Sequence, residues 1–411
     1  MDIKNAGVTS TIKIDTPNDA FNRLRVVHPH SVFNSKQIRD NQPLWWDDQE
    51  VSGSGTTSIH NMSQASVTIS VSNLTAGKRV RQTYQRMYYQ PGKSQNILMT
   101  GVIGSGTNGV TKRIGQFTEL NGLFFEQLGT AVRVVRRSRT SGTPTDFPVD
   151  QADWNLDKLD GSGISGVVLD ISKVQIFTID YQWLGTGEVK FGFFIGGRLI
   201  YCHRMLIANN LTTVYMATPD LPLRVEISND GTGGAASITH ICSAVTSEGG
   251  VDHTGMRVSI DRGTTGLTTL NDTDLYPLVA IRLKAGFFGT HIQLSRATTM
   301  VGGNTTLCKL VILFNPVVTG TPFSFTGLTN SAIEADISRT SATKVSGGVK
   351  MYSCYRGPTR QGGETSYNLS NGTILLGASI SGVPDVVVLA VQRITGTTEE
   401  FWGGIEWEEM L

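Results

Sequence analysis

The stretch from Val174 to Arg204 constrains the fold more than any other, because it reads as three antiparallel strands in succession. Phe177, Ile179 and Tyr181 alternate with polar residues, which is the period of two of a half-buried strand. Short glycine turns separate the strands, and Gly196-Gly197 supplies the positive φ angles of a two-residue hairpin. A meander with such turns predicts a β-sandwich or a β-barrel.

Composition supports an all-β chain, because 46 glycines and a charged fraction of 17% accompany many short β-branched runs. The 35 Lys and Arg nearly balance the 34 Asp and Glu, so no overall field draws the chain to nucleic acid or an anionic membrane. Its 411 residues exceed the about 250–300 at which single cores stop growing. We therefore expect a jelly-roll or concanavalin-like β-sandwich, a second β domain and an extended N-terminal arm.

The pattern changes along the chain and predicts three regions. Residues 1–72 are expected to form the arm, because polar runs, prolines and the Gly/Ser-rich stretch Ser52–Thr57 leave little periodicity. Residues 73–245 carry dense strand patterning that is typical of two packed sheets. Glycine-rich segments mark the linker that follows, and residues 246–411 are expected to form the second β domain.

Signals for a membrane, a metal or a cofactor are missing from the sequence. No apolar run approaches about 18 residues, and the polar N-terminus does not read as a signal peptide. The four cysteines lie far apart without a C-x-x-C pair, which favours buried free thiols. His28 and His30 have strand spacing but no evident third ligand, so a solvated or interface pair is favoured over a metal site. We predict no metal, no cofactor and no membrane insertion.

Catalytic motifs are also missing, and we predict that the chain is not an enzyme. It has no G-x-S-x-G and no H-E-x-x-H, and the Gln90–Ser94 segment lacks the first glycine of a phosphate-binding loop. Glu406 and Glu408 flank Trp407 with the spacing of a shared face. Because five of the last thirteen residues are Glu, we interpret this region as an acidic terminal tail rather than a glycosidase acid pair.

The basic run at 132–139 is the clearest candidate interface. Strand alternation sends Arg133, Arg137 and Arg139 to one face, where guanidinium groups suit bidentate capture of carboxylates. They could receive the Glu406 and Glu408 cluster of a neighbouring copy. Nucleic-acid binding is the rival, but it is not expected, because the net charge is near zero and no nucleic-acid motif is present. A solvated basic face stays open as well.

Trp45 and Trp46 form a second candidate interface within the predicted arm. Two adjacent tryptophans are costly to leave exposed, so something must cover them. Docking onto the chain's own sandwich and contact with a partner remain equal alternatives.

Five segments together carry a family resemblance. They are Phe21–Val26, Ser31–Gln37, Ser52–Thr57, Tyr89–Gln95 and Ile179–Gly185. These segments resemble virion structural proteins of tailed bacteriophages, also seen in some large DNA viruses, over about residues 15 to 230. The resemblance implies a non-enzymatic component of the virion, placed in the tail, neck or baseplate or on the capsid surface. Its implied partners are other copies of itself and other virion proteins.

A glycan-binding receptor module of the virion, an adhesin or fibre, is the alternative from another class. Exposed tryptophan or tyrosine rings could stack on the sugars of a host-surface glycan. The alternative loses its best residues if Tyr181 and Trp183 face a core. It gains if Trp154, Trp402 or Trp407 line an open groove. A depolymerase is a third hypothesis, and it would need two carboxylates facing across a cleft.

Overall fold

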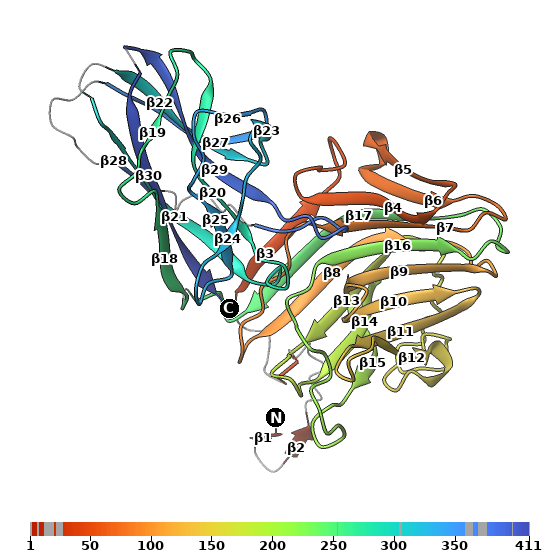
Figure 1. Ribbon diagram of the computed structural model, residues 1–411. Helices are drawn as coiled ribbons and strands as arrows, with labels where there is room; N and C mark the ends of the chain where they lie inside the picture. Colours follow the sequence, from red (N-terminus) through yellow and green to blue (C-terminus); the bar gives the residue numbers. More distant parts are fainter. Residues whose placement is uncertain are drawn as a thin grey trace. The chain divides into compact units, whose positions relative to one another are not determined.

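The structure is a computed structural model that describes residues 2–5, 8–11, 20–21, 28–252, 254–303, 306–357, 365–368, 376–396 and 398–410. Contacts divide the chain into two units (Figure 1). The first comprises residues 1–83 and 87–252, and the second comprises residues 84–86 and 253–411. Within the described residues the only helices are two single 3₁₀ turns, η1 (Met62–Gln64) and η2 (Gln151–Asp153). No helix there is long and apolar enough to cross a membrane.

The first unit contains two antiparallel sheets. The seven-stranded sheet has, in spatial order, β12 (Thr145–Asp150), β11 (Ala131–Ser138), β10 (Gly122–Leu128), β9 (Val110–Phe117), β16 (Leu223–Asn229), β7 (Gly77–Thr83) and β4 (Trp46–Gly53). The eight-stranded sheet has β15 (Arg198–Met205), β14 (Val189–Ile195), β13 (Gln175–Tyr181), β8 (Ser94–Val102), β17 (Ala236–Glu248), β6 (Ser66–Val71) and β5 (Thr56–Asn61), with β3 (Pro29–Lys36) also paired to β17. A separate pair joins β1 (Asp2–Asn5) and β2 (Val8–Thr11). The expected β-sandwich is confirmed.

An aromatic core fills the space between these two sheets. Phe125 from the seven-stranded sheet meets Phe177, Phe191 and Phe193 of the predicted meander at ring-centroid distances of 5.0 to 5.4 Å. Strand alternation explains the contact, since every second residue of β13 and β14 points inward. Burying such rings contributes favourably to the stability of the sandwich.

The structure differs from the expected arm over residues 29–71. Strands β3 to β6 occupy this range and pair within the eight-stranded and seven-stranded sheets. Polar side chains of β4 and β5 bond to one another: Thr56 Oγ1 donates to Glu50 Oε2 at 2.6 Å, and Ser58 donates to Asp48. Strands β4 and β5 carry little hydrophobic alternation, which is why the sequence pattern did not reveal them, whereas β6 alternates through Val67, Ile69 and Val71. Most of the segment Phe21–Val26 lies outside the described residues.

The second unit contains two further antiparallel sheets. One has β18 (Met256–Asp261), β30 (Glu400–Met410), β21 (His291–Val301) and β28 (Thr365–Asn368), with β19 (Leu267–Thr268) paired to β30. The other has β23 (Val317–Gly320), β26 (Thr343–Ser346), β20 (Leu275–Leu283), β29 (Val386–Thr395), β22 (Leu307–Phe314) and β27 (Val349–Arg356). In addition, β25 (Ile333–Asp336) pairs with β20, and β24 (Thr326–Gly327) pairs with β25. Its core is mainly aliphatic, with Tyr276, Phe401 and Trp407 as the buried rings.

Candidate functional site

The outer face of the seven-stranded sheet carries a row of alternating charges, which we call the charge row. In register across five strands it contains Asp150, Arg133, Glu126, Arg113 and Glu226. Directly opposed residues of antiparallel strands project from the same face, so each charge has an opposite charge beside it. The sequence alone does not reveal the row, because it depends on β16 lying between β9 and β7.

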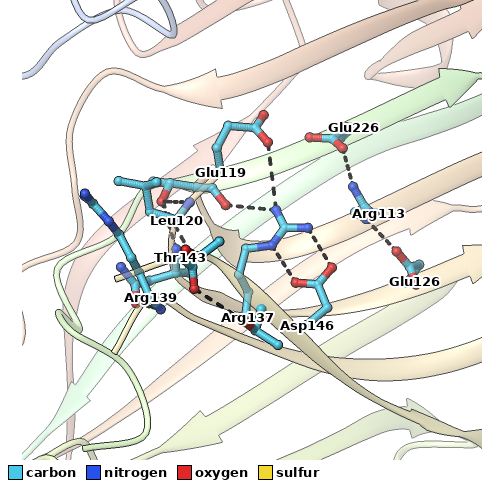
Figure 2. Close-up of polar contacts among 12 residues, drawn as sticks. Arg113, Glu119, Leu120, Glu126, Arg137, Arg139, Thr143, Asp146 and Glu226 are labelled. Carbon is cyan, nitrogen blue, oxygen red and sulfur yellow. Dashed lines mark hydrogen bonds and ion pairs between the residues drawn. The ribbon is translucent and has the colours of Figure 1, made fainter. Parts of the chain in front are cut away.

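Close ion pairs join the members of the row. Figure 2 shows Arg113 between two carboxylates, with Nε 2.6 Å from Glu126 Oε2 and Nη1 2.7 Å from Glu226 Oε1. Arg133 Nε reaches the other oxygen of Glu126 at 2.6 Å. Lys78 Nζ lies 3.2 Å from Glu226, and Arg224 Nη2 donates to Glu226 Oε2 at 2.6 Å. These contacts are short and largely shielded from solvent, because only 1% of the Glu226 side chain is exposed.

The surrounding cations decide the ionisation of Glu226. Burial by itself would raise the pKa of this carboxyl. Arg224, Lys78 and Arg113 outweigh burial and hold the pKa of Glu226 at about 2. Glu226 is therefore a permanent anion at neutral pH, which is the opposite of the raised pKa that a glycosidase general acid needs.

Guanidinium groups also cover a small apolar patch on this face. Phe117 and Phe124 are fully buried there, with ring centroids 4.5 Å apart. The guanidinium carbons of Arg113 and Arg137 lie 5.5 and 5.1 Å from the Phe124 ring, and that of Arg224 lies 5.3 Å from Phe117. These cation–π contacts help to hold the arginines flat against the sheet.

Two of the three predicted members, Arg133 and Arg137, project from one face of β11, and both are paired within the chain. Arg133 bonds to Glu126, as described above. Arg137 binds Asp146 with two bonds, Nε to Oδ1 at 2.6 Å and Nη2 to Oδ2 at 2.8 Å (Figure 2). Arg139 lies past the end of β11, is exposed and donates to the carbonyl of Gly142 at 3.3 Å. A contact between Arg139 and a neighbouring copy stays a prediction.

The two adjacent tryptophans have different surroundings. Trp46 is 2% exposed, packs against His240 at 4.7 Å and lies 4.9 Å from the guanidinium carbon of Arg81. Its indole Nε1 donates to Ser35 Oγ at 2.8 Å. Trp45 is 45% exposed and only touches the core edge, with its ring 6.2 Å from that of Phe33. Trp46 thus docks onto the chain's own sandwich, and a contact between the exposed Trp45 and a partner stays a prediction.

The interpretation of the C-terminal region as an acidic tail is wrong. Glu406 and Glu408 lie in β30, which pairs with β18 on one side and β21 on the other. Glu406 lies 3.6 Å from Arg296, and Glu408 accepts a bond from the backbone N–H of Gly255 at 3.1 Å. Trp407 points to the opposite face and is fully buried. The high density of Glu concealed a strand that buries Phe401, Ile405 and Trp407.

The aromatic residues proposed for sugar stacking are mostly in cores. Tyr181, Trp154 and Trp407 are at most 2% exposed. Trp183 is partly buried against the core, and its Nε1 donates to the carbonyl of Met216 at 3.0 Å. A glycan site built on these four rings therefore loses its support, whereas Trp402 is half-buried and its role in sugar stacking stays a prediction.

A polar hollow of about 520 Å³ lies next to the charge row, at one end of the seven-stranded sheet. We call it the end hollow. It is lined by Ser52, Gly53, Ala76, Gly77, Lys78, Asn108, Gly109, Thr111, Leu128, Gly129, Ser228, Asn229 and Asp230. Lys78, Ser228, Thr111 and Leu128 are register partners on adjacent strands, so the floor of the hollow continues the face that bears the charge row.

The end hollow contains one acidic side chain. Asp230 is the only carboxylate among the residues that line the end hollow, so the hollow offers no pair of facing acids. Among the described residues there is no group of three or more His, Cys, Asp or Glu that could hold a metal ion. His28 and His30, considered above as a ligand pair, are both exposed.

Comparisons with known proteins give a limited result. No protein-family model and no curated protein matches the chain. A β-glucanase of Bacillus licheniformis is 11% identical, with 53% of this chain and 98% of that chain covered at a TM-score of 0.34. A legume lectin-like domain from Entamoeba histolytica is 9% identical, with 52% and 96% covered at a TM-score of 0.31. A glycosyl hydrolase family protein from Mycobacterium fortuitum is 10% identical, with 53% and 99% covered at a TM-score of 0.36. Both enzymes and lectins are thus among these distant likenesses, which carry no argument about function.

Proposed function

We propose that this protein is a non-enzymatic structural component of a virus particle that assembles as a homo-oligomer. Its place would be the tail, neck or baseplate of the particle or the capsid surface. Other copies of itself and other virion proteins would be its partners. The resemblance of five segments to phage virion proteins is the basis of the virion role.

One contact in the first unit supports the view that this chain and the phage virion proteins have a structural scaffold in common. Two of the resembling segments, Tyr89–Gln95 and Ile179–Gly185, meet in the core. The rings of Tyr89 and Tyr181 stack at 5.8 Å, and the Tyr89 hydroxyl accepts a bond from the backbone N–H of Trp183 at 2.9 Å. The Tyr181 hydroxyl donates to Gln95 Oε1 at 2.6 Å. Residues that build a core in this way are expected to recur in similar proteins because they pack together, not because they take part in a reaction.

The state of Glu226 supports the non-enzymatic part of the proposal. This carboxylate is the most buried acid of the charge row, yet it is held ionised by three cations. A buried acid that catalyses proton transfer is expected to have its pKa moved toward neutrality. Glu226 is instead suited to stabilising the sheet.

Mass spectrometry of purified particles of the encoding virus tests the virion role. We expect the protein at a stoichiometry of several copies per particle, and particles without it would contradict the proposal. Light scattering on the full chain tests assembly, with Trp45→Ala and Arg139→Ala as variants of the two exposed candidate interface residues. We expect a defined oligomer for the wild type and a smaller species for at least one variant. A wild-type monomer at all concentrations would contradict the oligomer.

A further inference from the structure

We propose that the end hollow binds an uncharged, polyhydroxylated ligand, namely a neutral saccharide. Its volume of about 520 Å³ falls within the range of about 300–1,000 Å³ that is usual for small-molecule sites. A saccharide site is independent of the virion role, because either can exist without the other.

The groups that line the end hollow match the hydrogen-bonding pattern of a sugar. Ser52, Thr111 and Ser228 contribute hydroxyls, which donate and accept, and Asn108 contributes an amide with both functions. Asp230 adds a carboxylate that accepts from ligand hydroxyls. A ligand with many hydroxyls can satisfy such a set, whereas an apolar ligand would leave it unpaired.

Backbone contacts hold the Asp230 loop in place before any ligand arrives. The backbone N–H of Asp230 donates to the carbonyl of Gly109 at 3.0 Å. Asn229 fixes the same loop, because its Oδ1 accepts from the N–H groups of Gly231 at 2.9 Å and Gly233 at 3.1 Å. A preformed site loses less conformational entropy on binding than a mobile one.

Glycine is required where these loops approach each other. Gly109 has φ of +78°, and a Cβ there would lie 2.6 Å from Thr232 Oγ1 and 2.8 Å from Asp230 Oδ1. Gly53, on the far wall, has φ of +67°, and a Cβ there would lie 2.1 Å from the carbonyl oxygen of Ala76. Any side chain substituted at Gly53 or Gly109 would therefore displace backbone or Asp230.

Charge argues against an anionic or a metal-ion ligand. Lys78, the one cation of the lining, already contacts Glu119 at 2.9 Å and Glu226 at 3.2 Å. Hydrogen bonds from the Thr232 side chain and backbone lower the pKa of Asp230, so its carboxylate is charged and repels phosphate or sulfate. A single carboxylate is too few for a calcium site, which takes six to eight oxygen ligands.

One apolar side chain completes the match. Leu128 lines the end hollow and is 45% exposed, so it can cover the C–H face of a sugar ring. Because no aromatic residue is among the lining residues, we expect modest affinity that comes mainly from hydrogen bonds.

The test uses the full chain on a printed array of neutral, sialylated and sulfated glycans, followed by calorimetric titration of the strongest ligand. Two variants alter the site. Thr111→Trp fills the hollow, and Asp230→Asn removes the charge while keeping an oxygen for Thr232. Thr145→Trp, at an exposed position of β12 in the same sheet, is the matched control. Circular dichroism and thermal melting check that each variant is folded.

We expect binding to at least one neutral glycan, unchanged in Thr145→Trp and abolished in Thr111→Trp. Asp230→Asn should weaken it by about tenfold, because one hydrogen bond to a charged group is lost. Binding should persist when ionic strength rises from about 0.1 M to about 1 M. The proposal is overturned if no neutral glycan binds, if only acidic glycans bind, or if folded Thr111→Trp binds as the wild type does. If Thr111→Trp does not fold, unchanged binding by Asp230→Asn overturns it. Detection of the protein in particles would be unaffected by any of these results.

Discussion

Lys112 and Arg113 are consecutive residues of β9 that point to opposite faces of the seven-stranded sheet, and their surroundings have opposite effects. Arg113 lies between Glu126 and Glu226, and these carboxylates raise its pKa in spite of burial. Lys112 points inward and is 2% exposed, and within the described part of the chain its Nζ donates to the carbonyls of Ile103 at 2.7 Å and Ser105 at 2.9 Å. Burial lowers the pKa of Lys112 to about 8.

The difference teaches that burial alone does not decide the state of a charge in this protein. A carboxylate partner keeps the buried cation charged, whereas neutral carbonyls leave the cost of burial uncompensated. His240 is a second buried base, and its Nε2 lies 2.8 Å from the Ser243 hydroxyl. Burial, together with the charge of Arg81, lowers its pKa to about 3.

Removing the negative charge of Glu226 should have the largest effect on stability. Glu226→Gln leaves Arg113, Arg224 and Lys78 without their common anion. We expect a loss of about 3–5 kcal/mol in the free energy of unfolding of the first unit, as for other broken buried pairs. Urea denaturation measures it, with hydrogen exchange in β9 and β16 assigning the transition. Glu119→Gln is the control, because that side chain is 57% exposed and should cost under about 1 kcal/mol. Equal losses for the two variants would contradict the comparison.

The buried His240 should make the stability of the protein depend on pH in the acid range. Its folded-state pKa of about 3 lies below the usual 6.5, so the unfolded state binds a proton first as the pH falls. Between about pH 6 and pH 4.5 the wild type should lose about 2 kcal/mol of stability from this group. His240→Gln should have a correspondingly flatter profile in that window. Parallel profiles for the two proteins would show that His240 is already protonated in the fold.

Lys112 and Arg113 should also differ in their effect on stability at alkaline pH. Because the pKa of Lys112 is about 8 in the fold and about 10.5 when unfolded, stability should rise with pH above about 8. The gain is about 1.6 kcal/mol between pH 8 and pH 9.5. Lys112→Met should lack it, whereas a matched Arg113→Met variant should retain it despite lower overall stability. Thermal melting of the three proteins across this range makes the measurement, and a gain that survives in Lys112→Met would refute the assignment.

The smallest effect is expected for an exposed pair in the second unit. Arg296 and Glu406 lie 3.6 Å apart, with side chains 42% and 39% exposed. Glu406→Gln should change stability by less than about 1 kcal/mol at any salt concentration. A larger loss by urea denaturation would indicate that the pair belongs to a buried network in an assembly.

Much of the fold could be predicted from local sequence, and most of the candidate site could not. The meander gave clear signals, and it forms β13, β14 and β15 as expected. Strands β4 and β5 were missed because side chains in them, such as Asp48 and Ser58, are polar and bond to each other. The charge row depends on pairing between Arg113 and Glu226. Because these residues are far apart in the chain, no local sequence pattern predicts the row. The end hollow depends on the same strand order, since its residues come from five strands and the loops beside them.

The position of β30 has a consequence for biosynthesis. Val258 of β18 pairs with Trp407 of β30, which a ribosome working at about 5–20 residues per second makes on the order of ten seconds later. Until then β18 and β21 have no common partner, and their edges are open to wrong pairing with other nascent chains. Neighbouring copies on one polysome would therefore compete with β30, and slowing translation after residue 301 should increase aggregation of newly made chains.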